Sequence, residues 1–193
     1  MKISKEQAQQ NRERVVETAA RLFRERGFDG IGVADLMQGA GFTHGGFYNH
    51  FASKNALAVD AVRAAFLQRA TDTGPGEGID DILARYLSPQ HRDERGAGCP
   101  AAGLGGDAAR QPDEVKGVFA DGIGAMIQAF ESAVGRDDLP AGERRALAVN
   151  LLAKAVGAVV LARAVPDDHA LARELLESTL AGALREAQGT GAA

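Results

Sequence analysis

Apolar residues recur every three or four positions along most of this chain, and no stretch alternates convincingly with a period of two. The first spacing repeats one face of an α-helix, whereas a half-buried strand alternates at every second residue. The first stripe lies between Ser4, which opens a capping-box pattern with Gln7, and Gly27, a typical helix end. Its apolar members are Val15, Val16, Ala19, Leu22 and Phe23. The pattern predicts a first helix of about five turns.

Further stripes predict an all-α fold for the rest of the chain. Helices are expected over 33–40, 43–50, 53–68, 79–87, 99–111, 112–134, 140–164 and 171–184. The turn-rich stretch 88–100 is expected to be a loop, and the glycine-rich stretch 73–78 a break. We expect an N-terminal domain over 1–52 and a larger helical domain over 53–193, with 53–68 as the connecting helix.

Charge is divided unevenly between these parts. Residues 1–58 carry eight Lys or Arg and six Asp or Glu, a net charge of +2, although the whole chain carries −4. A mildly basic N-terminal segment in an otherwise acidic chain is typical of a protein that binds a polyanion through that segment.

The N-terminal part also contains two short helices joined by a glycine-containing turn, the layout of a helix-turn-helix. In such a unit the second helix presents its N-terminal residues to base edges in the major groove. Thr43 and His44 can form hydrogen bonds there, and Gly45 and Gly46 let the backbone approach the duplex closely. Tyr48 is expected on the exposed face.

The string LFRERGFDGIGVADLMQGAGFTHGGFYNHFASKNAL resembles the DNA-binding domain of the tetracycline-repressor (TetR/AcrR) family. The matching features are GF after the first helix, the AG turn and the segment FYNHFASK. The resemblance covers about a quarter of the chain. It implies a dimeric, DNA-binding transcriptional regulator, most often a repressor, that releases operator DNA when a small-molecule effector binds the larger domain.

Carried across by position, the resemblance puts His44, Gly45 and Tyr48 at operator contacts, Lys54 at a phosphate contact and Thr43 at the helix cap. Gly46 and Asn49 complete the expected DNA-binding set. The chain departs from the family pattern at Ile31 and Gly32, where Ser or Thr often caps the preceding helix. That departure predicts a weaker cap.

The last two helices predict a homodimer. Residues 146–164 are apolar around most of their circumference, so that helix must be buried, and Asn150 and Lys154 argue against a membrane span. The leucine stripe that follows offers a partner. We expect a four-helix bundle made by residues 146–164 and 169–186 of each subunit, the alternative being a central helix buried within a monomer.

Cys99 is the single cysteine, which excludes an intrachain disulfide and fits a reducing cytoplasm. A thiol-based redox or electrophile sensor would need a lowered thiol pKa, which a helix N-terminus and nearby arginines can supply. The alternative is an inert, small apolar side chain.

No catalytic constellation or metal-ligand spacing stands out, so we expect neither an enzyme nor a cofactor or metal site. The polar N-terminus carries no secretory signal, which favours a cytoplasmic protein. The alternative function is a helical small-molecule-binding protein without physiological DNA binding.

Overall fold

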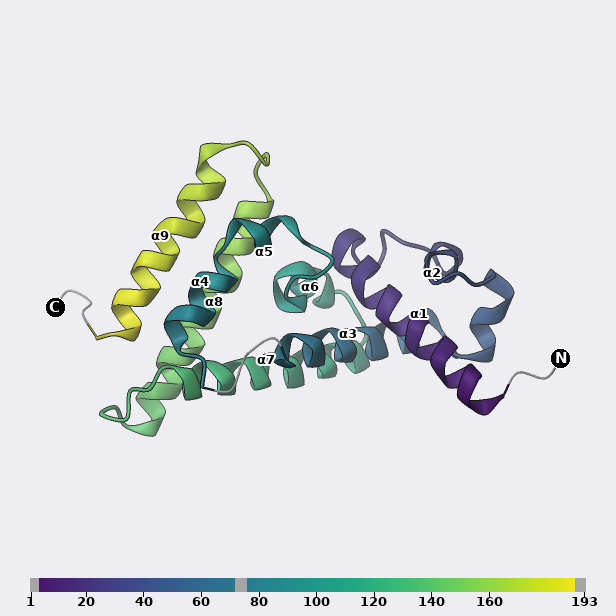
Figure 1. Ribbon diagram of the computed structural model, residues 1–193, viewed down its shortest axis with the longest axis horizontal. Coiled ribbons are helices and arrows are strands. Elements are labelled where there is room, and N and C mark those ends of the chain that lie inside the picture. Colours follow the sequence, from purple (N-terminus) through teal and green to yellow (C-terminus); the bar gives the residue numbers. More distant parts are fainter. Residues whose placement is uncertain (1–3, 72–75, 190–193) are drawn as a thin grey trace. The chain divides into compact units, whose positions relative to one another are not determined.

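The computed structural model describes residues 4–71 and 76–189, and every regular element in those ranges is helical, which confirms the all-α expectation (Figure 1). The elements are α1 (Lys5–Arg26), α2 (Val33–Gly39), the 3₁₀-helix η1 (His44–Asn49), α3 (Lys54–Thr71), α4 (Ile79–Tyr86), α5 (Pro89–Asp93), α6 (Pro100–Ala108), α7 (Asp113–Ala133), α8 (Ala141–Arg163) and α9 (Ala170–Ala187).

The chain divides into two compact units. The first comprises Met1–Arg69 and Arg95–Ala120, and the second Ala70–Glu94 and Asp121–Ala193. Helix α6 and the first part of α7 therefore share a unit with the N-terminal helices. The domain boundary expected between residues 52 and 53 stays a prediction.

Helix α1 has the ends that the sequence predicts. Ser4 Oγ accepts a hydrogen bond from the Gln7 backbone N–H (3.1 Å), and Gly27 closes the helix with φ 75°. The stripe is buried, with Val15, Ala19 and Phe23 at 0% exposure. Apolar residues at this spacing turn one face of α1 toward the core of the first unit.

Helix α6 crosses the end of α1 at close range within the first unit. A Cβ at Gly103 would lie 3.5 Å from the Cβ and Cγ of Arg24, and a Cβ at Gly27 would lie 2.4 Å from Asp107 Oδ2. Arg24 is 5% exposed. Because Gly103 and Gly27 have no side chains, α6 can lie this close to the last turn of α1.

Helices α2 and α3 follow expectation, with one exception. Gly32 occupies the cap position of α2 without a side-chain hydrogen bond, as the missing Ser or Thr predicts. Ser53 Oγ accepts from the Ala56 N–H (3.1 Å) and so caps α3. Leu67 is one of the apolar residues that predict α3, yet it is 63% exposed.

The stretch 88–100 is not entirely a loop, so that prediction was wrong. A short helix, α5, forms because Ser88 Oγ accepts from the His91 N–H (3.1 Å) and Pro89 takes the first helical position. In the second unit, Arg163 of α8 donates to the carbonyls of His91 (2.6 Å) and Arg92 (3.0 Å), which fastens the end of α5.

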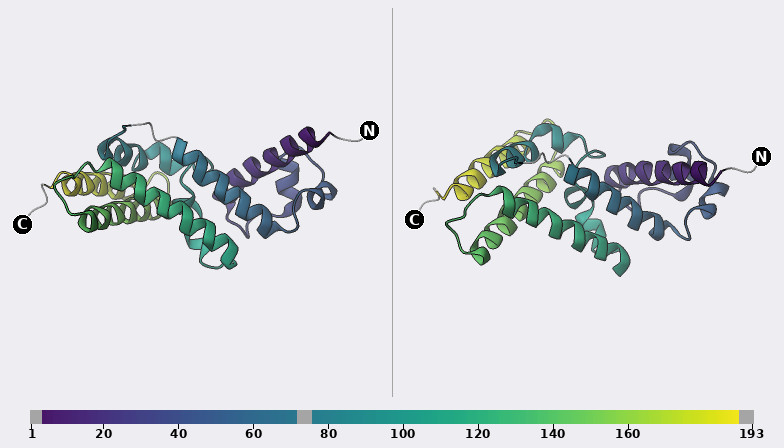
Figure 2. Two further views of the ribbon diagram at one scale, coloured as in Figure 1. Left: turned by 90° about the horizontal axis from the view of Figure 1, so that it is seen from below. Right: turned by 60° about the horizontal axis from the view of Figure 1, so that its bottom comes forward.

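Helices α8 and α9 lie side by side and antiparallel in the second unit, as the views in Figure 2 also show. Leu151, Ala155 and Val159 of α8 are buried, whereas Val149, Val160 and Leu161 are exposed. Only 39% of the most apolar stretch of α8 is buried within the single chain, so the alternative of a central helix buried within a monomer is wrong, and the expected homodimer stays a prediction. Helix α8 is long and apolar enough to cross a membrane, a test that core helices of soluble proteins also pass.

Candidate nucleic-acid interface

The candidate interface centres on residues 43–50, which we call the recognition turn. Its helical part is η1, a 3₁₀-helix, where the sequence suggested an ordinary short helix. Thr43 holds the cap position with extended backbone angles, but its side chain forms no capping hydrogen bond. The turn is closed by the backbone, since the Gly46 N–H donates to the Thr43 carbonyl (3.1 Å). Thr43 is exposed, so its hydroxyl is accessible from solvent.

The outward face carries the other residues expected to meet DNA. His44, Gly45 and Asn49 are exposed, and Tyr48 is 69% exposed. The rings of His44 and Tyr48 meet edge to face, with centroids 6.4 Å apart. This arrangement presents an imidazole, a phenol and an amide on one short turn, all of them groups that form hydrogen bonds with base edges or phosphates.

The two glycines leave open space on the same turn. A Cβ at Gly45 would meet no atom within 4 Å, and one at Gly46 would lie 3.6 Å from the Met37 Cε. Side chains at these positions would therefore fit within this chain. The protein's own packing therefore does not require glycine at either position.

The inward face of the turn is aromatic. Phe47 is 0% exposed and Phe51 3%, with ring centroids 5.6 Å apart. Phe47 also meets Tyr48 edge-on, at 5.2 Å and 88°. These rings anchor the turn to the core, which fixes the direction in which Tyr48 points.

Lys54 begins α3 and has a role that the sequence did not reveal. Its Nζ donates to the carbonyl oxygen of Phe28 (2.5 Å), which links α3 to the segment after α1. An ammonium has three donors, so two more can serve a phosphate next to a helix N-terminus. The Phe28 contact holds the cation in place.

Three residues near the turn were missed by sequence reasoning. The guanidinium carbon of Arg14 lies 5.9 Å from the Phe42 ring, and Arg14 Nη2 lies 3.3 Å from the Cβ position of Gly41, where φ is 81°. Arg12 and Asp60 form an ion pair between α1 and α3. The partners in these contacts are 27 to 48 residues apart in the sequence, too far for a local pattern to join them.

Cys99 stands at the cap position of α6 and is 0% exposed. Burial keeps oxidants and electrophiles from the thiol, which favours the inert interpretation. Of the two arginines near it in sequence, Arg92 donates to Asp93 (2.6 Å), and this hydrogen bond raises the pKa of Arg92. Among the described residues, no group of three or more His, Cys, Asp or Glu could hold a metal ion.

Helix α2 contacts both α1 and η1. Two short helices in contact, the second of them with an exposed polar face, are the arrangement of the helix-turn-helix in DNA-binding proteins. Comparison with known proteins agrees. Residues 15–61 match the family model described as bacterial regulatory proteins, tetR family. The match and the relatives support a transcriptional regulator of the tetR family.

Individual relatives carry the likeness beyond that segment. The transcriptional repressor NemR of Escherichia coli is 38% identical over 81 residues, which cover 39% of this chain and 41% of NemR. The aligned sequence thus spans less than half the length of NemR. An uncharacterized regulator of the helix-turn-helix type from Mycobacterium tuberculosis is 28% identical over 81% of this chain and 86% of its own.

Solved structures show the same fold over nearly the whole chain. The crystal structure of reduced NemR from Escherichia coli has a TM-score of 0.72 and 27% identity, over 89% of this chain and 94% of that one. A tetR-family regulator from Cytophaga hutchinsonii has a TM-score of 0.76 and 18% identity, over 98% of both chains. The N-terminal helix-turn-helix joined to a larger helical domain is therefore confirmed.

Proposed function

We propose that this protein is a cytoplasmic repressor that binds operator DNA through the recognition turn and is released when a small-molecule effector binds. The observation that carries the proposal is the outward face of the turn, where exposed His44 and Tyr48 flank a backbone bare of side chains at Gly45 and Gly46. The relative NemR is itself named a transcriptional repressor. Residues 1–52 carry DNA binding in this proposal, and residues 53–193 carry effector binding and dimerisation.

Each residue of the turn has a distinct part in the proposed complex. His44, Tyr48 and Asn49 read base edges or the adjacent backbone, and the two glycines allow η1 to sit deep in the groove. Lys54, with Thr43 as a hydroxyl donor, holds phosphate oxygens. Since few side chains reach the bases, sequence-dependent DNA shape contributes to the choice of operator.

Dimerisation supplies the second half-site. Exposed Val160 and Leu161 need a cover, and a groove of about 390 Å³ between α8 and α9 provides a complementary surface. Its lining is mostly small and apolar and comprises Lys154, Gly157, Ala158, Leu161, Leu175, Thr179, Gly182 and Ala183. A second copy related by a two-fold axis would bury both faces in a four-helix bundle. Two recognition turns about 34–36 Å apart would then read successive major grooves.

Effector release is supported by the packing of α6 on α1. An effector that shifts α6 would change the surroundings of Arg24 and Gly27, which lie at the C-terminal end of α1. Helix α1 in turn packs against α2 in the DNA-binding part. By linkage, the factor by which the effector weakens DNA binding equals the factor by which DNA weakens effector binding. The burial of Cys99 argues against a thiol sensor as the means of release.

The decisive experiment titrates the full chain against DNA from upstream of its own gene, by fluorescence anisotropy at several salt concentrations. We expect binding at least about a thousandfold tighter than to scrambled DNA, with affinity falling steeply as salt rises. Equal affinity for both DNAs would contradict sequence-specific regulation. It would favour a helical small-molecule-binding protein instead.

A further inference from the structure

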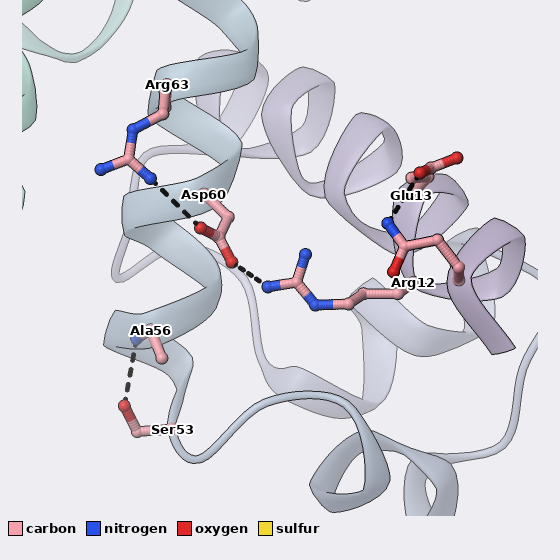
Figure 3. A network of polar contacts seen from close by, with 7 residues as sticks. Arg12, Glu13, Ser53, Ala56, Asp60 and Arg63 are labelled. Carbon is pink, nitrogen blue, oxygen red and sulfur yellow. Dashed lines mark hydrogen bonds and ion pairs between the residues drawn. The ribbon is translucent and has the colours of Figure 1, made fainter. Parts of the chain in front are cut away.

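Arg12 of α1 connects two features of the first unit. Its guanidinium forms an ion pair with Asp60 of α3 (Figure 3), and its Cζ lies 4.9 Å from the centroid of the Phe51 ring. Both charged side chains are half-buried, at 35% and 26% exposure. Arg63 reaches the same carboxylate at 3.5 Å from within α3 itself. Asp60 therefore holds one arginine across the helix interface and another along its own helix.

The ring under Arg12 is the first in a row that ends at the outward face. Phe51 meets Phe47 at 5.6 Å, and Phe47 meets Tyr48 edge-on at 5.2 Å. A guanidinium over an aromatic face is attracted by the ring's negative surface. We call Phe51, Phe47 and Tyr48 the aromatic row. Arg12 contacts the Phe51 end of this row, and Tyr48 at the other end is exposed.

The recognition turn needs support of this kind because its own stabilisation is weak. It is a 3₁₀-helix, Thr43 gives it no side-chain cap, and Gly45 has no neighbour within 4 Å of a Cβ position. Glycine pairs also lose much conformational entropy when a helix forms. The orientation of the turn therefore depends on its buried aromatic residues.

We propose that Arg12 and Asp60 are positioning residues that brace the aromatic row and so set the orientation of Tyr48 and His44 toward DNA. The proposal rests on the proposed function of the recognition turn. The brace affects discrimination between DNA sequences rather than general attraction to phosphate. It makes the ion pair between α1 and α3 part of the specificity of the protein, although neither residue reads a base.

Two simpler interpretations make different predictions. If Arg12 contacted phosphate directly, its loss would weaken binding to every DNA. It would also reduce the slope of log affinity against log salt concentration by about one. If the pair were an ordinary surface ion pair, its loss would change little, because such pairs contribute little to stability. The position of the guanidinium over Phe51 distinguishes the brace from both.

The first test needs no DNA. Amide hydrogen exchange, measured by NMR, follows three backbone donors that bond to carbonyls of the turn: Gly46, His50 and Phe51. We expect Arg12→Gln and Asp60→Asn to speed exchange at these amides by about fivefold or more, the loss of a cation–π contact together with a partly buried ion pair. The Gly27 amide, bonded to the Phe23 carbonyl at the C-terminal end of α1, is a reference outside the turn and should change much less.

Arg63→Gln is the matched control, since it removes the same charge from the same carboxylate but leaves α1 and Phe51 untouched. We expect wild-type exchange in Arg63→Gln and in the conservative variant Asp60→Glu. Arg12→Lys keeps the charge without the planar guanidinium and should give an intermediate rate. Wild-type exchange in Arg12→Gln would overturn the brace.

The second test measures DNA binding. For Arg12→Gln we expect affinity for the upstream operator to fall about fivefold to tenfold, with scrambled-DNA affinity within about twofold and an unchanged salt slope. Equal weakening on both DNAs with a shallower slope would identify Arg12 as a phosphate contact and overturn the proposal. If wild-type protein does not distinguish the two DNAs, the proposed function fails, and the exchange rates still decide whether the brace exists.

Discussion

The ring of Tyr48 stands edge-on to that of Phe47, with centroids 5.2 Å apart and planes at 88°, although Tyr48 is 69% exposed and Phe47 fully buried. The buried Phe47 ring therefore restricts the orientation of the exposed Tyr48 ring. The phenol is held ready for a partner, at a lower entropic cost of binding than a mobile side chain would have.

Removing the Tyr48 ring should alter sequence preference. We expect Tyr48→Ala to weaken operator binding about tenfold or more while scrambled-DNA binding changes little, because a lost base contact costs about 1–3 kcal/mol. Anisotropy with both DNAs measures the ratio. Tyr48→Phe keeps the Phe47 contact and separates the hydroxyl's part from the ring's. An unchanged ratio in both variants would remove Tyr48 from the interface.

Lys54→Ala should weaken binding to all DNAs alike and reduce the salt slope by about one. Thermal unfolding should also shift down slightly, because the hydrogen bond to the Phe28 carbonyl is lost. Lys116→Ala is the control: it removes the same charge from an exposed lysine that pairs with Asp113 on α7. A preference for particular sequences that changes in Lys54→Ala would contradict a pure phosphate role.

Gly45→Ala should stabilise the protein and impair its function together. The φ angle at Gly45 is not positive and a Cβ has open space, so alanine should raise stability by about 0.5–1 kcal/mol. The added methyl group should nevertheless lower operator affinity, since it meets the duplex. Gly105→Ala in α6, where a Cβ also has open space, should stabilise without affecting DNA binding. Unimpaired DNA binding by Gly45→Ala would refute close backbone approach.

Leu161→Glu should dissociate the proposed dimer. A carboxylate left in an apolar contact costs a few kcal/mol, so the dimer dissociation constant should rise about a hundredfold or more. Light scattering after size-exclusion chromatography measures the mass. Leu67→Glu changes a similarly exposed leucine, 63% against 55%, on α3 and should leave the mass unchanged. A wild-type monomer at micromolar concentration would defeat the dimer.

Much of the fold could be predicted because its signals are local. Ser4, Ser53 and Gly27 begin or end helices through hydrogen bonds to residues three or four positions away. The same kind of signal at Ser88 and Pro89 lay within a polar, turn-rich stretch, and α5 was therefore missed. Local capping chemistry deserves more weight than the composition around it.

The supports of the candidate interface could not be predicted in the same way. Arg12 and Asp60 are 48 residues apart, and only the packing of α1 on α3 brings them together. The bond from Lys54 to Phe28 likewise joins residues 26 positions apart. The partial exposure of α8 is a third example, because periodicity shows which residues are apolar but not which chain covers them.

The close crossing of α1 and α6 has a consequence for protein engineering. A chimera that exchanged only residues 1–52 with another regulator would set a foreign first helix against Gly103 and Asp107. Any other residue at position 27 would be strained by the φ of 75° and would require the Asp107 carboxylate to move, whatever operator the graft was chosen to read. Interchangeable DNA-reading heads for this scaffold should therefore be selected for the last turn of their first helix as well as for their recognition turn.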